Sequence, residues 1–133
     1  MTVRFLDLEE SSNPLNGTRI DDKGELLKLL DGLRGRHPFL CQLAGDNGYM
    51  LMMGIGGPVG CVQHSPTNGD TPYLLAVSNA ERDTDGEDVE FLAGGTPTPI
   101  SPRNGFPFES VKQIAVYFLE TGNRMPSISW EEI

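Results

Sequence analysis

The sequence predicts an α+β fold in which two helices pack on a mainly antiparallel sheet of about six or seven strands, in the order β-α-β-β-β-β-β-α-β. Two amphipathic segments predict the helices, and five short apolar segments separated by turn residues predict most of the strands. The chain of 133 residues is long enough for one hydrophobic core, and it has no internal repeat or linker that would divide it. We therefore expect a single domain over residues 1–133.

The N-terminal part of the chain predicts a strand followed by a helix. Residues 2–8 are expected to form the opening strand, although their alternation leaves open which face is buried. A helix is expected over residues 23–34, because Asp22 and Glu25 form a typical capping pair and Gly35 is a typical stop. The inward stripe of this helix consists of Leu26, Leu29, Leu30 and Leu33.

The middle of the chain predicts strands joined by tight turns. Short connections favour antiparallel pairing between strands that are neighbours in the sequence. The expected turns are Gly45–Gly48, Gly56–Pro58, Thr67–Asp70 and the pair Asp85-Gly86. The expected strands cover residues 39–43, 49–55, 59–63, 73–78 and 89–92.

The C-terminal part predicts a second helix and a short final strand. Pro107 opens the helix, which runs to about Thr121, and Gly122 closes it. Ile128 and Trp130 then share one face of the final strand and are expected to pack on the core. The helix residues expected to face inward are Val111, Ile114, Ala115, Phe118 and Leu119.

The charge balance of the chain argues against several classes of function. Ten basic and nineteen acidic side chains leave a net charge of −9, which repels phosphate backbones and anionic lipids. Direct binding to nucleic acid or to a membrane is therefore not expected. The first residues turn acidic before an apolar signal segment can develop, and the two cysteines fit a reducing compartment. We expect a cytoplasmic protein.

A run of carboxylates that follows the expected strand 73–78 is the first candidate site. It comprises Glu81, Asp83, Asp85, Glu87, Asp88 and Glu90, and only Arg82 relieves its charge. Such a surface can dock on a basic protein, or it can be a solvated hairpin loop that keeps the chain soluble. The spacing of its first carboxylates is similar to the start of a calcium loop. A calcium loop needs a Glu at position twelve, however, where this chain has Gly94.

A second candidate site combines His37, Cys41, Cys61 and His64, whose spacing a zinc site could use. It supports an alternative function as a small metal-binding or enzymatic domain. Both cysteines lie in apolar segments, where a buried thiol is the ordinary occupant. On a strand, moreover, Cys61 and His64 point to opposite faces. We therefore expect no metal, no cofactor and no catalytic residue.

The C-terminal part of the sequence resembles the bacterial immunity proteins that neutralise deaminase-type toxins of polymorphic toxin systems. The similarity extends from about Tyr73 to the end of the chain, and it includes a Gly-Gly after a strand and a proline at the start of the second helix. The residues that carry it are Gly94, Gly95, Pro107, Phe118, Thr121, Gly122, Pro126, Trp130, Glu132 and Ile133.

The resemblance implies a toxin inhibitor rather than an enzyme. Its partner would be a cognate protein toxin, a nucleic-acid deaminase, whose active site or substrate groove the immunity protein blocks. The acidic run would then meet basic toxin residues that hold the substrate. The expected toxin-binding residues are Tyr73, Asp83, Asp85, Glu87, Asp88 and Glu90. The identity of the toxin and the oligomeric state are left open.

Overall fold

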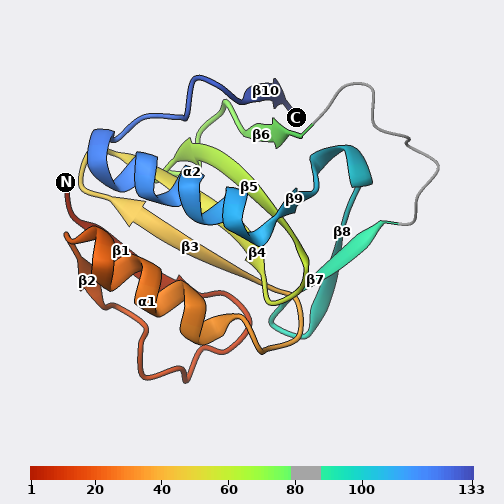
Figure 1. Cartoon of the computed structure of the whole chain (residues 1–133), viewed down its shortest axis with the longest axis horizontal. Coiled ribbons are helices and arrows are strands. Elements are labelled where there is room, and N and C mark those ends of the chain that lie inside the picture. The colour runs from red at the N-terminus through yellow and green to blue at the C-terminus, as the bar shows by residue number, and fades with distance from the viewer. Residues whose placement is uncertain (79–87) are drawn as a thin grey trace.

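The computed structural model describes residues 1–78 and 88–133 of the chain. In this part of the protein, ten strands form one sheet and two α-helices cover one of its faces (Figure 1). The predicted α+β class is therefore confirmed. In chain order the elements are β1 (Val3–Asp7), β2 (Arg19–Ile20), α1 (Lys23–Leu33), β3 (Phe39–Gly45), β4 (Tyr49–Ile55), β5 (Val59–Pro66), β6 (Leu74–Val77), β7 (Val89–Ala93), β8 (Thr96–Ile100), the 3-10 helix η1 (Pro102–Asn104), β9 (Phe106–Pro107), α2 (Phe108–Thr121) and β10 (Ser129–Glu132).

The main path through the sheet is β10-β6-β5-β4-β3-β1-β2. Two further strands, β7 and β8, form a hairpin that attaches to β3, and β9 attaches to β5. All of these pairs are antiparallel except the contact between β3 and β7, where Phe39 lies opposite Leu92. Antiparallel pairing of neighbours is thus confirmed for β3, β4, β5 and β6.

The sheet has more strands than the sequence predicted. Two of the additional strands, β2 and β9, are only two residues long and carry no periodicity. The third, β8, contains Pro97 and Pro99, and proline normally argues against a strand. It is tolerated here because β8 pairs only with β7, so its other edge needs no N–H donors.

The predicted hairpin between residues 73–78 and 89–92 is wrong. The turn residues Asp85 and Gly86 lie outside the described residues, but the flanking strands β6 and β7 have other partners. β6 lies between β5 and β10, and β7 pairs with β3 and β8. The hairpin of β7 instead turns at Gly94 and Gly95, whose φ angles of +58° and +81° favour glycine.

The helix boundaries follow the predicted caps with one correction. Asp22 accepts a hydrogen bond from the Glu25 N–H at 3.0 Å, as expected of an N-cap. Gly122 closes α2 in the left-handed conformation, and its N–H donates to the Phe118 carbonyl at 2.7 Å. The predicted end of α1 at residue 34 is one residue late, since α1 ends at Leu33 and Arg34 is a right-handed C-cap directly before Gly35.

A large hydrophobic core lies between the helices and the sheet. The helices bury the predicted stripes, except that Leu29 is only partly buried. On β1 the buried side chains are Val3, Phe5 and Asp7, which settles the face that the sequence left open. Ile128 and Trp130 pack against this core, as predicted.

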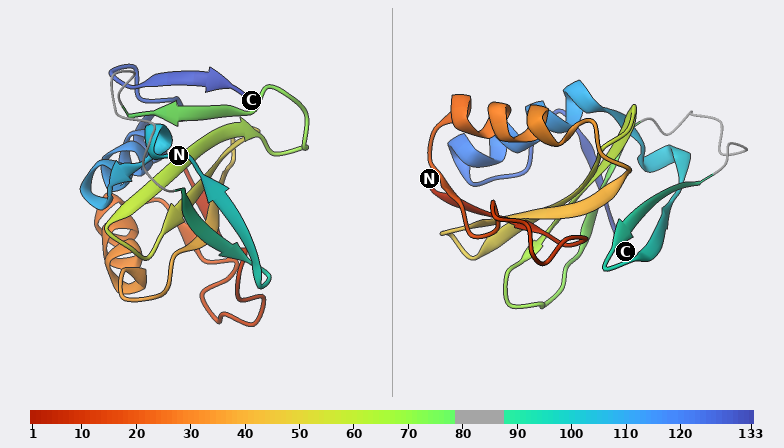
Figure 2. Two further views of the ribbon diagram at one scale, coloured as in Figure 1. Left: turned by 90° about the vertical axis from the view of Figure 1, so that its right-hand side faces the viewer. Right: turned by 90° about the horizontal axis from the view of Figure 1, so that it is seen from below.

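A smaller core lies on the opposite face of the sheet, under the β7–β8 hairpin, which Figure 2 shows on the side away from the helices. It consists of Leu40, Cys61 and Phe91. Gly54 makes room for it, because a Cβ atom at this position would lie 2.6 Å from the Phe91 ring. Within the described residues, no helix is long and apolar enough to cross a membrane.

Candidate functional site

The predicted acidic site is only partly within the described residues. Asp83, Asp85 and Glu87 lie outside them, as does most of the calcium-like pattern. Asp88 and Glu90 are described, and both are exposed. Neither carboxylate has a hydrogen bond or an ion pair with any residue of 1–78 or 88–133. Within the described part of the chain, both carboxylates are therefore unpaired.

Strand alternation determines the direction of Glu90. Its neighbour Phe91 is 1% exposed and points into the small core beneath the hairpin. Successive side chains of a strand point to opposite faces, so Glu90 points away from that core. On the adjacent strand it lies opposite Pro99. The hairpin thus presents a carboxylate on a rigid strand rather than on a loop.

Tyr73 lies apart from Asp88 and Glu90. It precedes β6 at the end that faces away from the acidic run, and its hydroxyl donates to the Gly69 carbonyl within a turn. Its own carbonyl accepts a hydrogen bond from the Ile133 N–H at 3.0 Å. Tyr73 therefore lies beside the C-terminal end of β10, and the structure does not bring it together with the hairpin carboxylates.

The strand β10 next to Tyr73 carries two further carboxylates that sequence reasoning did not place in the site. Glu131 forms an ion pair with Arg103 at 2.8 Å and accepts a hydrogen bond from Asn104 at 3.1 Å. Glu132 is exposed and has no partner among the described residues. The Trp130 side chain is half-buried, and its Nε1–H donates to the Met125 carbonyl at 3.2 Å, so Trp130 has a structural role.

The buried imidazole of His64 lies against β10. It stacks on Tyr49 with ring centroids 5.1 Å apart, and its edge faces Phe118 and Trp130. Burial, together with the positive charge of Arg124, lowers the pKa of His64 from 6.5 to about 4. This histidine is therefore neutral near pH 7 and belongs to the aromatic core.

The four possible zinc donors do not converge. Cys41 packs in the large core on the helix side of the sheet, whereas Cys61 packs in the small core on the opposite side. His64 also lies on the helix side, which confirms that it and Cys61 point to opposite faces. Burial raises the pKa of the Cys61 thiol to about 12 and also raises that of Cys41, so both remain protonated thiols. Among the described residues, no group of three or more His, Cys, Asp or Glu side chains could hold a metal ion.

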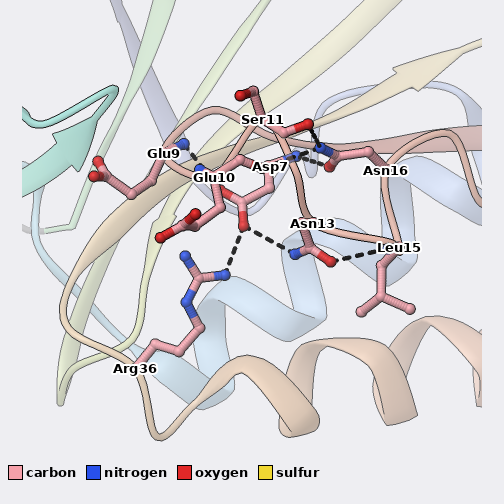
Figure 3. Close-up of polar contacts among 8 residues, drawn as sticks. All are labelled: Asp7, Glu9, Glu10, Ser11, Asn13, Leu15, Asn16 and Arg36. Atoms are coloured by element: carbon pink, nitrogen blue, oxygen red, sulfur yellow. Dashed lines mark hydrogen bonds and ion pairs between the residues drawn. The ribbon is translucent and has the colours of Figure 1, made fainter.

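A network around Asp7 holds the loop after β1 in place (Figure 3). This carboxylate is 2% exposed and forms an ion pair with Arg36 at 2.6 Å. It also accepts hydrogen bonds from the side-chain amide of Asn13 and from the backbone N–H groups of Glu9 and Glu10. Burial raises the pKa of Asp7, but the hydrogen bonds, led by that from Arg36, outweigh burial and hold the pKa below its usual 3.8.

The same loop connects to the β7–β8 hairpin. Both carboxylate oxygens of Glu9 accept a hydrogen bond from the Gly95 N–H, each at 3.1 Å. Glu9 is itself positioned by its N–H bond to Asp7. The buried Asp7 network is therefore connected through Glu9 to the hairpin that carries Glu90, whose strand β7 directly follows Asp88. Sequence reasoning missed this connection, since 86 residues separate its two ends.

The family of the chain follows from a comparison with known proteins. A family model described as immunity protein Imm1 matches residues 14–132. A search of curated proteins found no match. The family match covers α1, α2 and every described strand except β1, and it includes all the C-terminal residues that carry the resemblance to immunity proteins except Ile133. The resemblance is thereby confirmed, while the deaminase type of the toxin remains a prediction. The chain belongs to the Imm1 family of immunity proteins, which act against toxins.

Proposed function

We propose that this immunity protein acts in the bacterial cytoplasm, where it binds a cognate nucleic-acid deaminase and blocks its active site or substrate groove. The observation that carries the proposal is the exposed pair Asp88 and Glu90, which has no internal partner among the described residues. These carboxylates end the acidic run of a protein with a net charge of −9. They are available to basic groups of the toxin.

The electrostatic logic follows from the substrate of the toxin. An enzyme that acts on nucleic acid holds phosphates with basic side chains. A negative surface on the inhibitor is attracted to the same groove, which speeds encounter and excludes wrong partners. Inhibition then needs no chemistry from the immunity protein, only occupation of the groove. This is consistent with a chain that is not an enzyme.

The deaminase type is supported by the C-terminal resemblance. Trp130 and Glu132 lie on β10, and Thr121 and Gly122 lie at the end of α2. These residues belong to the part of the chain whose sequence resembles immunity proteins of deaminase toxins. The contact surface must bind one toxin and reject others, so contact residues differ between immunity proteins. The contact residues of this chain therefore have to be identified by experiments on this chain.

A deamination assay tests the proposal. The toxin domain encoded by the neighbouring reading frame is purified and assayed on single-stranded and double-stranded DNA and RNA, with increasing amounts of the immunity protein. We expect deamination to fall in proportion to the added protein until the ratio reaches one to one. An unrelated protein of similar net charge serves as the control and should not inhibit. A toxin that deaminates at full rate in the presence of excess immunity protein would contradict the proposal.

A further inference from the structure

We propose that the free edge of β10 receives an extended, basic segment of the toxin as an additional strand of the sheet. The inference rests on the proposed function, because the toxin is the partner that supplies the segment. It adds a second contact surface to the acidic run, one made of backbone groups. Such strand addition combines affinity from main-chain hydrogen bonds with specificity from the alternating side chains.

The hydrogen-bond pattern of β10 shows which backbone groups are available. The Ile133 N–H donates to the Tyr73 carbonyl at 3.0 Å, so Ile133 faces β6. In an antiparallel pair, residues that face the partner strand alternate with residues that face away from it. Glu131 and Ser129 therefore also face β6. The N–H and C=O groups of Trp130 and Glu132 point to the open side, where no described residue bonds them.

The position of β10 leaves this side accessible. It is the last strand on its end of the main path, and Figures 1 and 2 show it at the margin of the molecule with β6 on its inner side. Its four residues, Ser129–Glu132, include no proline or bulge that would block pairing, and its only charged side chains are the carboxylates Glu131 and Glu132, which discourage pairing with another acidic strand.

The other edges of the described sheet are blocked or short. β8 carries Pro97 and Pro99, which remove donors from its free side. Both β2 and β9 are two residues long. Beyond β2, the edge of β1 is occupied, because Phe5 exchanges backbone hydrogen bonds with Gly17 and Thr18. Within the described residues, β10 therefore offers the longest unprotected edge.

The negative charge of β10 indicates which kind of strand can pair with its free edge. Two of its four side chains are carboxylates, and Glu132 is exposed without a partner in the described part of the chain. Opposite charges on neighbouring strands stabilise a pair, whereas like charges destabilise it. A second copy of this chain would bring a second unpaired Glu132 to a strand spacing of about 4.8 Å, whereas Glu131 is already paired with Arg103. A basic segment of the toxin satisfies the same groups, so the edge favours the toxin over self-association.

The edge is continuous with the predicted contact residues. Ser129, the first residue of β10, lies opposite Val77. The acidic run begins a few residues after Val77 in the sequence, at Glu81. A hollow of about 380 Å³ opens at this end and is lined in part by Ser78, Ile128 and Trp130. Tyr73 lies at the other end. A strand added along β10 would therefore run between Tyr73 and the start of the acidic run.

A pair of variants separates the backbone contribution from the charge. Glu132→Ala removes the carboxylate and keeps the N–H, whereas Glu132→Pro removes both. The N–H of Glu132 points away from β6, so its loss should leave the free protein folded, which thermal unfolding checks. Since the Glu132 N–H would donate a main-chain hydrogen bond to the added strand and proline also hinders close approach, we expect Glu132→Pro to bind the toxin about tenfold more weakly than Glu132→Ala.

Hydrogen exchange of the wild-type chain, followed by NMR with and without the neighbouring toxin domain, provides a measurement that does not depend on any variant. We expect the amides of Trp130 and Glu132 to become protected in the complex, while those of Ser129 and Glu131 are already protected in the free protein. A wild-type complex that forms and inhibits, but shows neither this alternation nor the effect of proline, would overturn the strand-addition proposal and leave the immunity function intact. Failure of the wild-type chain to bind the toxin would overturn the proposed function, and this inference with it.

Discussion

Carboxylates at two places in this protein differ in how fully their hydrogen-bonding capacity is used. Asp7 is buried and accepts bonds from Arg36, Asn13 and two backbone N–H groups. Asp88 and Glu90 are exposed and have no partner among residues 1–78 and 88–133. A carboxylate that is satisfied within the fold stabilises the fold, whereas a free one on a rigid strand is available to another molecule. The two regions thus separate folding from binding within one acidic protein.

The comparison also shows that the two regions are connected. Asp7 fixes the N–H of Glu9, and Glu9 accepts the N–H of Gly95 at the tip of the β7–β8 hairpin. The satisfied carboxylates are therefore connected to the hairpin whose strand β7 carries Glu90 and directly follows Asp88. Removing a satisfied carboxylate should reduce stability, and removing a free one should affect only association.

The largest effect is expected at Asp7. Asp7→Ala leaves the Arg36 guanidinium, the Asn13 amide and two backbone N–H groups without their acceptor. Breaking a buried pair typically costs about 3–5 kcal/mol, and the partial exposure of Arg36 favours the lower end, about 3 kcal/mol. Urea unfolding of the free protein at pH 7 measures this loss. An equal effect of Asp88→Ala would remove the distinction between the two regions.

A comparable loss of stability is expected at low pH from His64, a buried imidazole that the fold keeps in its neutral form. Its folded pKa of about 4 lies below the unfolded value of 6.5, so the unfolded state binds the proton more tightly. The contribution is fully present above pH 6.5 and falls as the pH decreases toward 4, where the loss approaches about 3 kcal/mol.

Urea unfolding of the wild type and of His64→Phe between pH 7 and pH 4 measures this dependence. The phenylalanine keeps an aromatic ring next to Tyr49 and Trp130 and carries no titrating group. We expect the stability of the variant to change less over this range than that of the wild type. Parallel curves for the two proteins would show that His64 is not held neutral by the fold.

A smaller effect is expected for Glu9, which joins the two regions. Glu9→Ala removes the acceptor of the Gly95 N–H and should cost about 1 kcal/mol, the usual contribution of one hydrogen bond. The amide of Gly95 should exchange with solvent faster, which NMR measures directly, and Glu10→Ala provides a neighbouring control. Unchanged exchange at Gly95 would mean that the hairpin is positioned by its core contacts alone.

The smallest effect on stability is expected for the free carboxylates. The double variant Asp88→Ala, Glu90→Ala should unfold within about 0.5 kcal/mol of the wild type, because exposed substitutions without partners rarely cost more. Thermal and urea unfolding provide the measurement. A loss of stability well above this value would mean that Asp88 and Glu90, like Asp7, stabilise the fold.

The sequence predicted the elements whose signals are local. Asp22 with Glu25, and Gly122, mark helix ends through bonds to residues within four positions, and the leucine and aromatic stripes follow one period. The pairing of β3 to β6 follows from short turns. The opposite-face placement of Cys61 and His64 follows from the strand period alone.

The contacts that the sequence did not predict are those that depend on distant segments. On one side β6 pairs with β10, more than fifty residues away, so the local Asp-Gly signal led to the wrong hairpin. Proline in β8 is acceptable only because that strand lies at an edge. Nothing next to Asp7 identifies Arg36 as its partner, and nothing next to Glu9 identifies Gly95. The open edge of β10 is likewise a property of the assembled sheet.

The association rate with the toxin as a function of salt tests most directly whether the free carboxylates form the binding surface. Stopped-flow measurements compare the wild type with the double variant Asp88→Lys, Glu90→Lys. The control is the double variant Asp21→Lys, Glu120→Lys, which makes the same change of charge at exposed sites just before α1 and in the last turn of α2. We expect the hairpin variant to associate at least about tenfold more slowly than the control at low salt, with the difference largely lost at 1 M salt. Equal rates for the two variants at every salt concentration would contradict the account.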